Sequence, residues 1–156
     1  MKYSFVIPVY NRPDEVDELL ESLCSQEQRD FEAVVVEDGS SVPCEEVVKR
    51  YADKLDVHYF SKPNSGPGQT RNYGVERAKG DYVIILDSDV VVPPGYLAAV
   101  DAELTAAPCD AFGGPDRALR RLPDRYPGDD PKNWKPQPAP LPGQPLAHPG
   151  SAHRLR

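Results

Sequence analysis

Residues 81–89 have the sequence DYVIILDSD, and the rest of the chain is organised around this stretch. Its five consecutive apolar residues, 82–86, predict a short strand that is buried on both faces. Asp87 and Asp89 follow at the end of that strand, and in an extended chain side chains two positions apart point to the same side. Because neighbouring carboxylates repel each other, a divalent cation between them is one interpretation and a polar turn is the other.

Strands and helices are expected to alternate along most of the chain. Apolar runs rich in β-branched residues predict the strands, and apolar residues three and four positions apart predict the helices, the first of them capped by Asn11. The expected strands are 3–9, 31–36, 57–60 and 81–87, with a fifth from 110, and the expected helices are 13–26, 43–52, 69–79 and 96–106. This alternation predicts an α/β fold with βαβ units and a mostly parallel sheet.

Polar residues gather at one predicted edge of this sheet. In parallel α/β sheets, ligands bind outside the carboxyl ends of the strands. Residues 8–11, 37–40 and 87–89 follow the first, second and fourth expected strands and bring several acidic side chains to that edge. The sequence therefore predicts a ligand site there.

The loop and helix start at residues 64–74, NSGPGQTRNYG, add an anion-binding feature. Two glycines allow a ligand to approach the backbone, the helix N-terminus offers N–H groups, and Arg71 lies one turn into the helix, within reach of a phosphate. A Gly- and Pro-rich loop with a solvated arginine is the simpler alternative. The stretch matches neither a P-loop nor a dinucleotide fingerprint.

Charge and proline divide the chain into two parts. Residues 1–115 carry 21 acidic and 10 basic residues, which argues against nucleic acid as a partner. Residues 116–156 carry 8 basic and 4 acidic residues, are rich in proline, and lack helical or strand periodicity. We expect a domain over 1–115 and a Pro/Arg-rich, largely disordered tail over 116–156.

Cysteine usage and hydropathy indicate the compartment. Cys24, Cys44 and Cys109 are widely spaced and predict neither a disulfide framework nor a zinc site, which fits a reducing environment. His58 is expected to be a packed or edge histidine. No apolar run reaches the roughly 18 residues of a membrane span, and the N-terminal run is too short for a signal peptide. We expect a cytoplasmic protein, and peripheral attachment to the inner face of the membrane stays open.

Four motifs together resemble the N-terminal, nucleotide-sugar-binding half of the inverting family-2 glycosyltransferases of the GT-A fold. They are VIPVYN at 6–11, VVEDGS at 35–40, GQTRNYG at 68–74 and LDSD, the DxD motif, at 86–89. Each motif alone is weak, but their order and spacing over residues 3–115 are specific. The resemblance implies a Rossmann-like GT-A domain that transfers a sugar from a nucleotide-diphosphate donor, UDP-linked, to a saccharide or lipid-linked acceptor.

The resemblance also assigns the residues around the nucleobase. The backbone at Pro8, Val9 and Tyr10 would line the base pocket. Asp38 would accept hydrogen bonds from a uracil-like base, and Glu37 would lie beside it, where the family more often has aspartate.

The remaining donor contacts follow from the same resemblance. Arg71 would lie near the base and the diphosphate, and Asp87 would approach the ribose and the metal shell. Asp89 would bind Mg²⁺ or Mn²⁺, and this ion would also bind the diphosphate and act as a Lewis acid on the leaving group.

One expected group has no counterpart in the sequence. Inverting transfer needs a general base, which in this family lies in the second half of the domain. The segment after residue 116 offers Asp124, Asp129 and Asp130 without a base-bearing motif. We therefore expect a truncated or frame-shifted product, and an inactive remnant that at most binds the nucleotide sugar is the alternative. A third hypothesis, a haloacid-dehalogenase-like phosphatase with Asp87 as nucleophile, would need this motif on the first strand.

Overall fold

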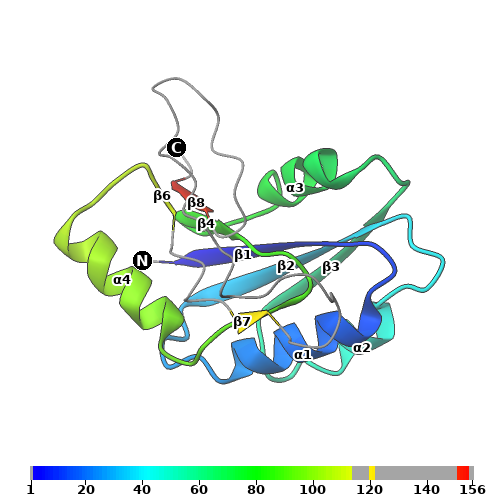
Figure 1. Ribbon diagram of the computed structural model, residues 1–156, viewed down its shortest axis with the longest axis horizontal. Coiled ribbons are helices and arrows are strands. Elements are labelled where there is room, and N and C mark those ends of the chain that lie inside the picture. Colours follow the sequence, from blue (N-terminus) through cyan, green and yellow to red (C-terminus); the bar gives the residue numbers. More distant parts are fainter. Residues whose placement is uncertain (1, 114–119, 122–150, 155–156) are drawn as a thin grey trace, which may run out of the picture.

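The sheet is the centre of the computed structural model, which describes residues 2–113, 120–121 and 151–154 of the 156-residue chain. Within these ranges the main sheet has the strand order β3-β2-β1-β4-β8-β6 (Figure 1). The strands are β1 (Tyr3–Val9), β2 (Phe31–Asp38), β3 (Val57–Lys62), β4 (Tyr82–Ile85), β6 (Ala111–Gly113) and β8 (Ser151–Arg154). The four consecutive strands β3, β2, β1 and β4 are parallel, and β8 is antiparallel to both of its neighbours. The predicted α/β fold with a mostly parallel sheet is confirmed.

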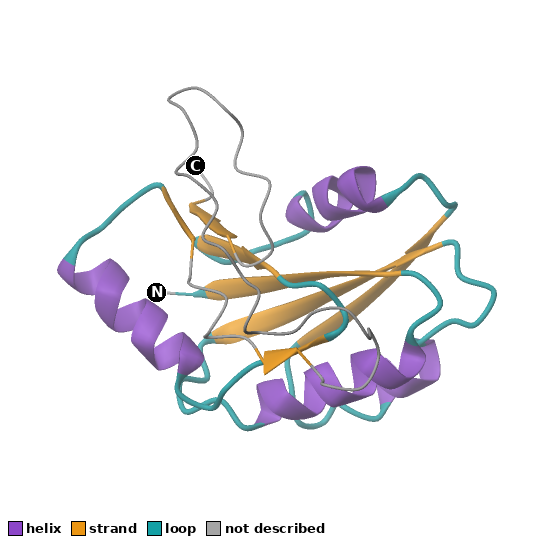
Figure 2. Cartoon of the chain, viewed as in Figure 1, coloured by secondary structure: helices purple, strands orange, loops and turns teal. Residues whose placement is uncertain are grey.

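Among the residues that the structure describes, three helices connect the parallel strands, a fourth lies between β5 (Val90–Val91) and β6, and together they cover both faces of the sheet (Figure 2). They are α1 (Pro13–Cys24), α2 (Glu45–Lys49), α3 (Pro67–Val75) and α4 (Tyr96–Ala106). The helices α1 and α2 lie along one face and α3 along the other (Figure 1). Over the described part of the chain, no helix has the length and apolarity needed to cross a membrane.

Both faces of β1 and β2 are buried, as the apolar runs predict. The larger core cluster takes Tyr3, Phe5 and Ile7 from β1, and the smaller one takes Val6 together with β2 residues such as Val34. Side chains that alternate along a strand reach opposite faces, so one strand supplies both clusters. The helix α3 lies close to the second face, since a Cβ at Gly74 would come within 2.5 Å of Val6 Cγ1.

Element ends differ from the sequence-based expectations. The helix α2 is shorter than expected, because turns occupy residues 50–54. The predicted Asn11 cap is wrong, since Arg12 occupies the N-cap position and makes no side-chain cap bond. Asn11 has a φ of 51° and its Oδ1 accepts hydrogen bonds from Ser41 Oγ at 3.1 Å and Val42 N at 3.0 Å.

The chain after Ile85 leaves the sheet earlier than predicted. The strand β4 ends at Ile85, although the Leu86 N–H still donates to the Val6 carbonyl at 3.0 Å. Residues 88–89 then form a turn that leads into β5 (Val90–Val91), which pairs with β7 (Arg120–Arg121). The expectation that Asp87 and Asp89 continue an extended strand is therefore wrong.

Two strands fall within the segment 116–156, for which we expect disorder. They are β7 and β8, and β8 adds to the main sheet by backbone pairing with β4 and β6. Main-chain hydrogen bonds need no apolar pattern, which is why periodicity gives no sign of these strands. The rest of the segment, with Asp124, Asp129 and Asp130, lies outside the described residues.

Candidate functional site

A cavity of about 420 Å³ opens at the carboxyl ends of β1, β2 and β4, where the sequence predicts a ligand site. Its walls come from the segment after β1, the end of β2, the loop and first turn of α3, and the segment after β4. The lining residues are 8–10, 12, 38, 64, 66–67, 70–71 and 87–89. Its volume lies in the usual range of small-molecule sites.

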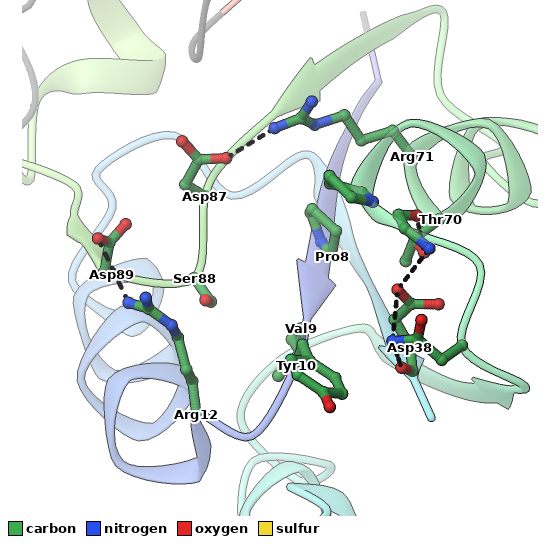
Figure 3. A pocket seen from close by; sticks show the side chains of 13 residues that line it. Pro8, Val9, Tyr10, Arg12, Asp38, Thr70, Arg71, Asp87, Ser88 and Asp89 are labelled. Atoms are coloured by element: carbon green, nitrogen blue, oxygen red, sulfur yellow. Dashed lines mark hydrogen bonds and ion pairs between the residues drawn. The ribbon is translucent and has the colours of Figure 1, made fainter. Parts of the chain in front are cut away.

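The two carboxylates of the DSD stretch each face an arginine (Figure 3). Asp87 Oδ1 lies 3.1 Å from Arg71 Nη2, and Asp89 Oδ2 lies 3.5 Å from Arg12 Nη1. About a third of each of these four side chains is exposed. Because the pairs are open to solvent, each contributes at most about 1 kcal/mol and can be exchanged for a ligand.

Arg71 has capacity for a further acceptor. Its Nη2 is paired with Asp87, but its Nε is buried and has no hydrogen-bond partner among the described residues. A buried donor without a partner is unfavourable. Arg71 belongs to the second turn of α3, whose first residues also line the cavity, so a reorientation of the side chain could bring this N–H to an anion bound near the helix N-terminus.

Asp38 lines the cavity but is tied to the loop that leads into α3. Its carboxylate forms an ion pair with Lys62 and accepts backbone N–H bonds from Ser65 at 2.9 Å and Gly66 at 3.0 Å. Burial alone raises the pKa of this carboxyl, but Lys62 and the Ser65 N–H lower the pKa by more, so that it lies below its ordinary value. Asp38 is therefore ionised and holds the loop in place.

Glu37 is the predicted site residue that does not line the cavity. Neighbouring residues of a strand point to opposite faces, so Glu37 points away from Asp38. Its buried carboxylate accepts hydrogen bonds from the Ser40 hydroxyl, from Cys44 N at 2.7 Å and from Tyr59 Oη at 3.2 Å. These bonds tie β2 to the turn that follows it and to β3.

Residues 8–10 form the wall of the cavity between Asp38 on one side and Asp87 and Asp89 on the other (Figure 3). Pro8 and Val9 present backbone and apolar surface, while the Tyr10 side chain is 54% exposed. A large exposed ring at the edge of a cavity can stack on a planar ligand such as a nucleobase.

Arg12 and Asn64 line the cavity, although the sequence gives neither of them an individual role. Asn64 Nδ2 donates to the Asp38 carbonyl at 2.9 Å, and Arg12 faces Asp89 from the end of the β1–α1 turn. Arg12 follows the first predicted strand and Asn64 follows the third, and both strands are predicted to end at the edge of the sheet where the ligand site is expected. A count of the basic residues near that edge would have identified Arg12.

The cavity carboxylates fit a hard divalent cation. Asp87 and Asp89, each about a third exposed, line the same cavity and carry carboxylate oxygens, which are the ligands that Mg²⁺ and Mn²⁺ prefer.

Comparison with known sequences gives one family. A sequence profile described as Glycosyl transferase family 2 matches residues 4–139. The poly(ribitol-phosphate) β-N-acetylglucosaminyltransferase TarS of Staphylococcus aureus is 38% identical over 93 residues, which are 57% of this chain and 16% of that protein. The chain thus spans about one-sixth of the length of this curated relative.

Two solved structures share the fold. The crystal structure of TarS from S. aureus in complex with UDP-GlcNAc has a TM-score of 0.69 and 33% identity, and the match covers 72% of this chain and 34% of that one. The mannosyltransferase PcManGT from Pyrobaculum calidifontis, in complex with GDP-Man and Mn²⁺, has a TM-score of 0.65 and 25% identity, with coverages of 72% and 34%.

Proposed function

The chain belongs to glycosyl transferase family 2, and on this premise we propose that its cavity binds a nucleotide-diphosphate sugar, UDP-linked, as the donor for transfer to a saccharide or lipid-linked acceptor. The observation that carries the proposal is that Asp87, Asp89 and Arg71 line one cavity of about 420 Å³ at the carboxyl ends of the strands. The similarity to TarS, which was solved with UDP-GlcNAc, supports the choice of a uridine nucleotide.

Asp87 and Asp89 are the proposed ligands of Mg²⁺ or Mn²⁺. Their carboxylates offer hard oxygen atoms on one wall of the cavity, and the donor diphosphate would supply further oxygens. When bound, such an ion acts as a Lewis acid that stabilises the negative charge of the departing nucleoside diphosphate. The Mn²⁺ complex of the P. calidifontis mannosyltransferase supports this assignment.

The two arginines are proposed to change partners when the donor binds. Arg71 has a buried Nε without a partner among the described residues, so a diphosphate oxygen would satisfy it while Asp87 turns to the metal. Arg12 faces Asp89 through a half-exposed pair that an incoming cation can replace. The chain thereby keeps its carboxylates neutralised before the donor arrives.

Pro8, Val9, Tyr10 and Asp38 are the proposed nucleobase contacts. The exposed Tyr10 ring is available for stacking. Asp38 already accepts four hydrogen bonds, so a base N–H would replace the longest of them, which Asn64 Nδ2 donates at 3.4 Å. Its first role is therefore to fix the loop, and its second is to bind the base. Glu37 supports this wall from the opposite face of β2.

Calorimetric titration of UDP with and without Mn²⁺ tests the proposal. We expect Mn²⁺ to strengthen UDP binding by the wild type, and Asp89→Ala to weaken binding in Mn²⁺ by at least about 10-fold. Asp53→Ala removes the same charge from an exposed position outside the cavity and should leave binding unchanged. Equal UDP binding by the wild type and Asp89→Ala would refute the assignment.

Transfer needs a separate measurement, because the described carboxylates of the cavity are assigned to the donor and its metal. UDP release from a UDP-sugar in acceptor mixtures reports turnover. Metal-dependent UDP binding without turnover would identify the inactive form that we consider as the alternative. The phosphatase hypothesis is wrong, since the DSD stretch follows the fourth strand of a glycosyltransferase domain.

A further inference from the structure

A second group of potential metal ligands lies at the opposite edge of the sheet from the cavity. Glu32 is the second residue of β2, and Asp56 and His58 flank the first residue of β3. One ligand atom from each residue can be chosen so that all three lie within 4.8 Å of one another. The group lies at the amino ends of the strands, so it is separate from the proposed donor site.

Glu32 brings a buried, incompletely satisfied carboxylate to this group. Its side chain is fully buried, and Oε1 accepts hydrogen bonds from Ser4 Oγ at 2.6 Å and Lys79 N at 2.5 Å. Its Oε2 is equally inaccessible and has no hydrogen-bond partner among the described residues. This oxygen points toward His58, whose Nε2 is 3.4 Å away. A buried carboxylate oxygen that accepts no hydrogen bond is unfavourable. A cation bound to this oxygen would offset the cost of its burial.

The distances suit a small tetrahedral ion. His58 Nε2 lies 3.4 Å from Glu32 Oε2 and 3.1 Å from Asp56 Oδ1. A tetrahedral Zn²⁺ with bonds of about 2.0–2.1 Å places its ligand atoms roughly 3.3 Å apart. His58 thus already has the spacing of a shared ion to each carboxylate, and ligand atoms of Glu32 and Asp56 lie within 4.8 Å of each other.

We propose that Glu32, Asp56 and His58 bind a divalent transition-metal ion of the Zn²⁺ class. One imidazole and two carboxylates suit Zn²⁺ better than Mg²⁺, which prefers oxygen alone. Asp56 and His58 are partly exposed, which gives the ion a path from solvent and leaves a fourth position for water. Lys2 Nζ, 3.3 Å from the other Asp56 oxygen, would turn outward. The ion would join the starts of β2 and β3.

Zinc titration of histidine variants tests this site. The chain has three histidines, and His148 and His153 lie beyond the described side chains, so the double variant His148→Ala/His153→Ala isolates His58. We expect calorimetry with ZnCl₂ to show one tight equivalent bound by this double variant, in addition to weaker binding at the all-oxygen site of the cavity. Adding His58→Ala or Asp56→Asn should weaken Zn²⁺ binding by at least about 10-fold. Glu32→Gln is less suitable, because Glu32 also holds Ser4 and Lys79.

Two further measurements distinguish this site from zinc binding elsewhere on the chain and from a loss of fold. Co²⁺ substitution should give the absorption of a nitrogen- and oxygen-bound ion, whereas a thiolate-to-cobalt band would assign the metal to the cysteines and overturn the proposal. UDP binding with Mn²⁺ should be the same for the double variant with and without His58→Ala, which shows that the fold and the cavity are intact. Unchanged Zn²⁺ affinity after His58→Ala, or no Zn²⁺ bound at all, would leave an ion pair of His58 with the two carboxylates and refute the site.

Discussion

The two edges of the sheet hold their carboxylates in different ways. At the carboxyl edge, Asp87 and Asp89 are about one-third exposed and each faces one arginine side chain. At the amino edge, Glu32 is buried and accepts hydrogen bonds from the Ser4 hydroxyl and the Lys79 backbone N–H. A guanidinium on a flexible side chain can turn away when a ligand arrives, whereas a backbone N–H is fixed by the chain. The carboxyl edge is therefore suited to exchange partners, and the amino edge to hold strands together.

The largest expected effect comes from disturbing the amino edge at Gly80. The Gly80 N–H donates to Ser4 Oγ at 2.8 Å, and a Cβ at this position would lie 2.7 Å from the Tyr3 carbonyl carbon and 2.8 Å from Ser4 N. These are backbone atoms of β1, so they cannot move without shifting the strand. We expect Gly80→Ala to lower the free energy of unfolding by about 2 kcal/mol, measured by urea denaturation.

Gly95→Ala is the matched control for this prediction. No atom lies within 4 Å of a Cβ built at Gly95, which precedes α4, and its φ of −87° suits alanine. Because Gly95 is the N-cap of α4, where alanine is less favourable than glycine, we expect a loss of at most about 1 kcal/mol. If the two variants were equally stable, the amino edge would be able to relax, and the contrast between a fixed and an exchangeable edge would be lost.

The fold was predictable because its central strands have continuous apolar sequences. Residues 33–36 and 82–86 are too short and too rich in β-branched or aromatic residues for buried helices, and their alternation with helical patterns predicts the parallel sheet. Less predictable were the features that depend on the rest of the molecule. The strand β8 forms by backbone pairing with β4 and β6, and the end of β4 at Ile85 depends on where its neighbours end.

The position of the candidate site was predictable from the sequence, because the carboxyl ends of the predicted strands mark the edge of the sheet at which it lies. Seven of the eight predicted residues line the cavity, because the carboxyl ends of parallel strands meet at one edge. Glu37 is the exception, and the alternation of side chains along β2 already indicated that it points away from Asp38. The pairing of Arg12 with Asp89 could not be predicted, because it depends on a turn that sequence periodicity does not describe.

Removing Arg12 tests whether the carboxyl edge exchanges partners. Arg12 Nη1 lies 3.5 Å from Asp89 Oδ2 in a half-exposed pair, whose strength we expect to be about 0.5–1 kcal/mol. If a metal ion has to displace this arginine, Arg12→Ala should tighten Mn²⁺ binding to the nucleotide-free protein by about 2- to 5-fold. Calorimetric titration with MnCl₂ measures this directly. Weaker Mn²⁺ binding by Arg12→Ala would instead show that the arginine supports the cation site.

The smallest expected effect concerns Asp38, which combines properties of both edges. It lies in the cavity, yet backbone N–H groups and the largely covered side chain of Lys62 hold it. The pKa of Asp38 in the folded protein lies below the ordinary value of 3.8. The ionised carboxylate therefore adds its full stability above pH 3.8. This stability is lost as the pH falls through the folded-state pKa. The stability difference between the wild type and Asp38→Asn should therefore shrink below about pH 4, with exposed Asp53→Asn as the baseline. Urea denaturation from about pH 7 to about pH 3 measures it, and a difference independent of pH would mean that the loop, rather than the charge, holds Asp38 in place.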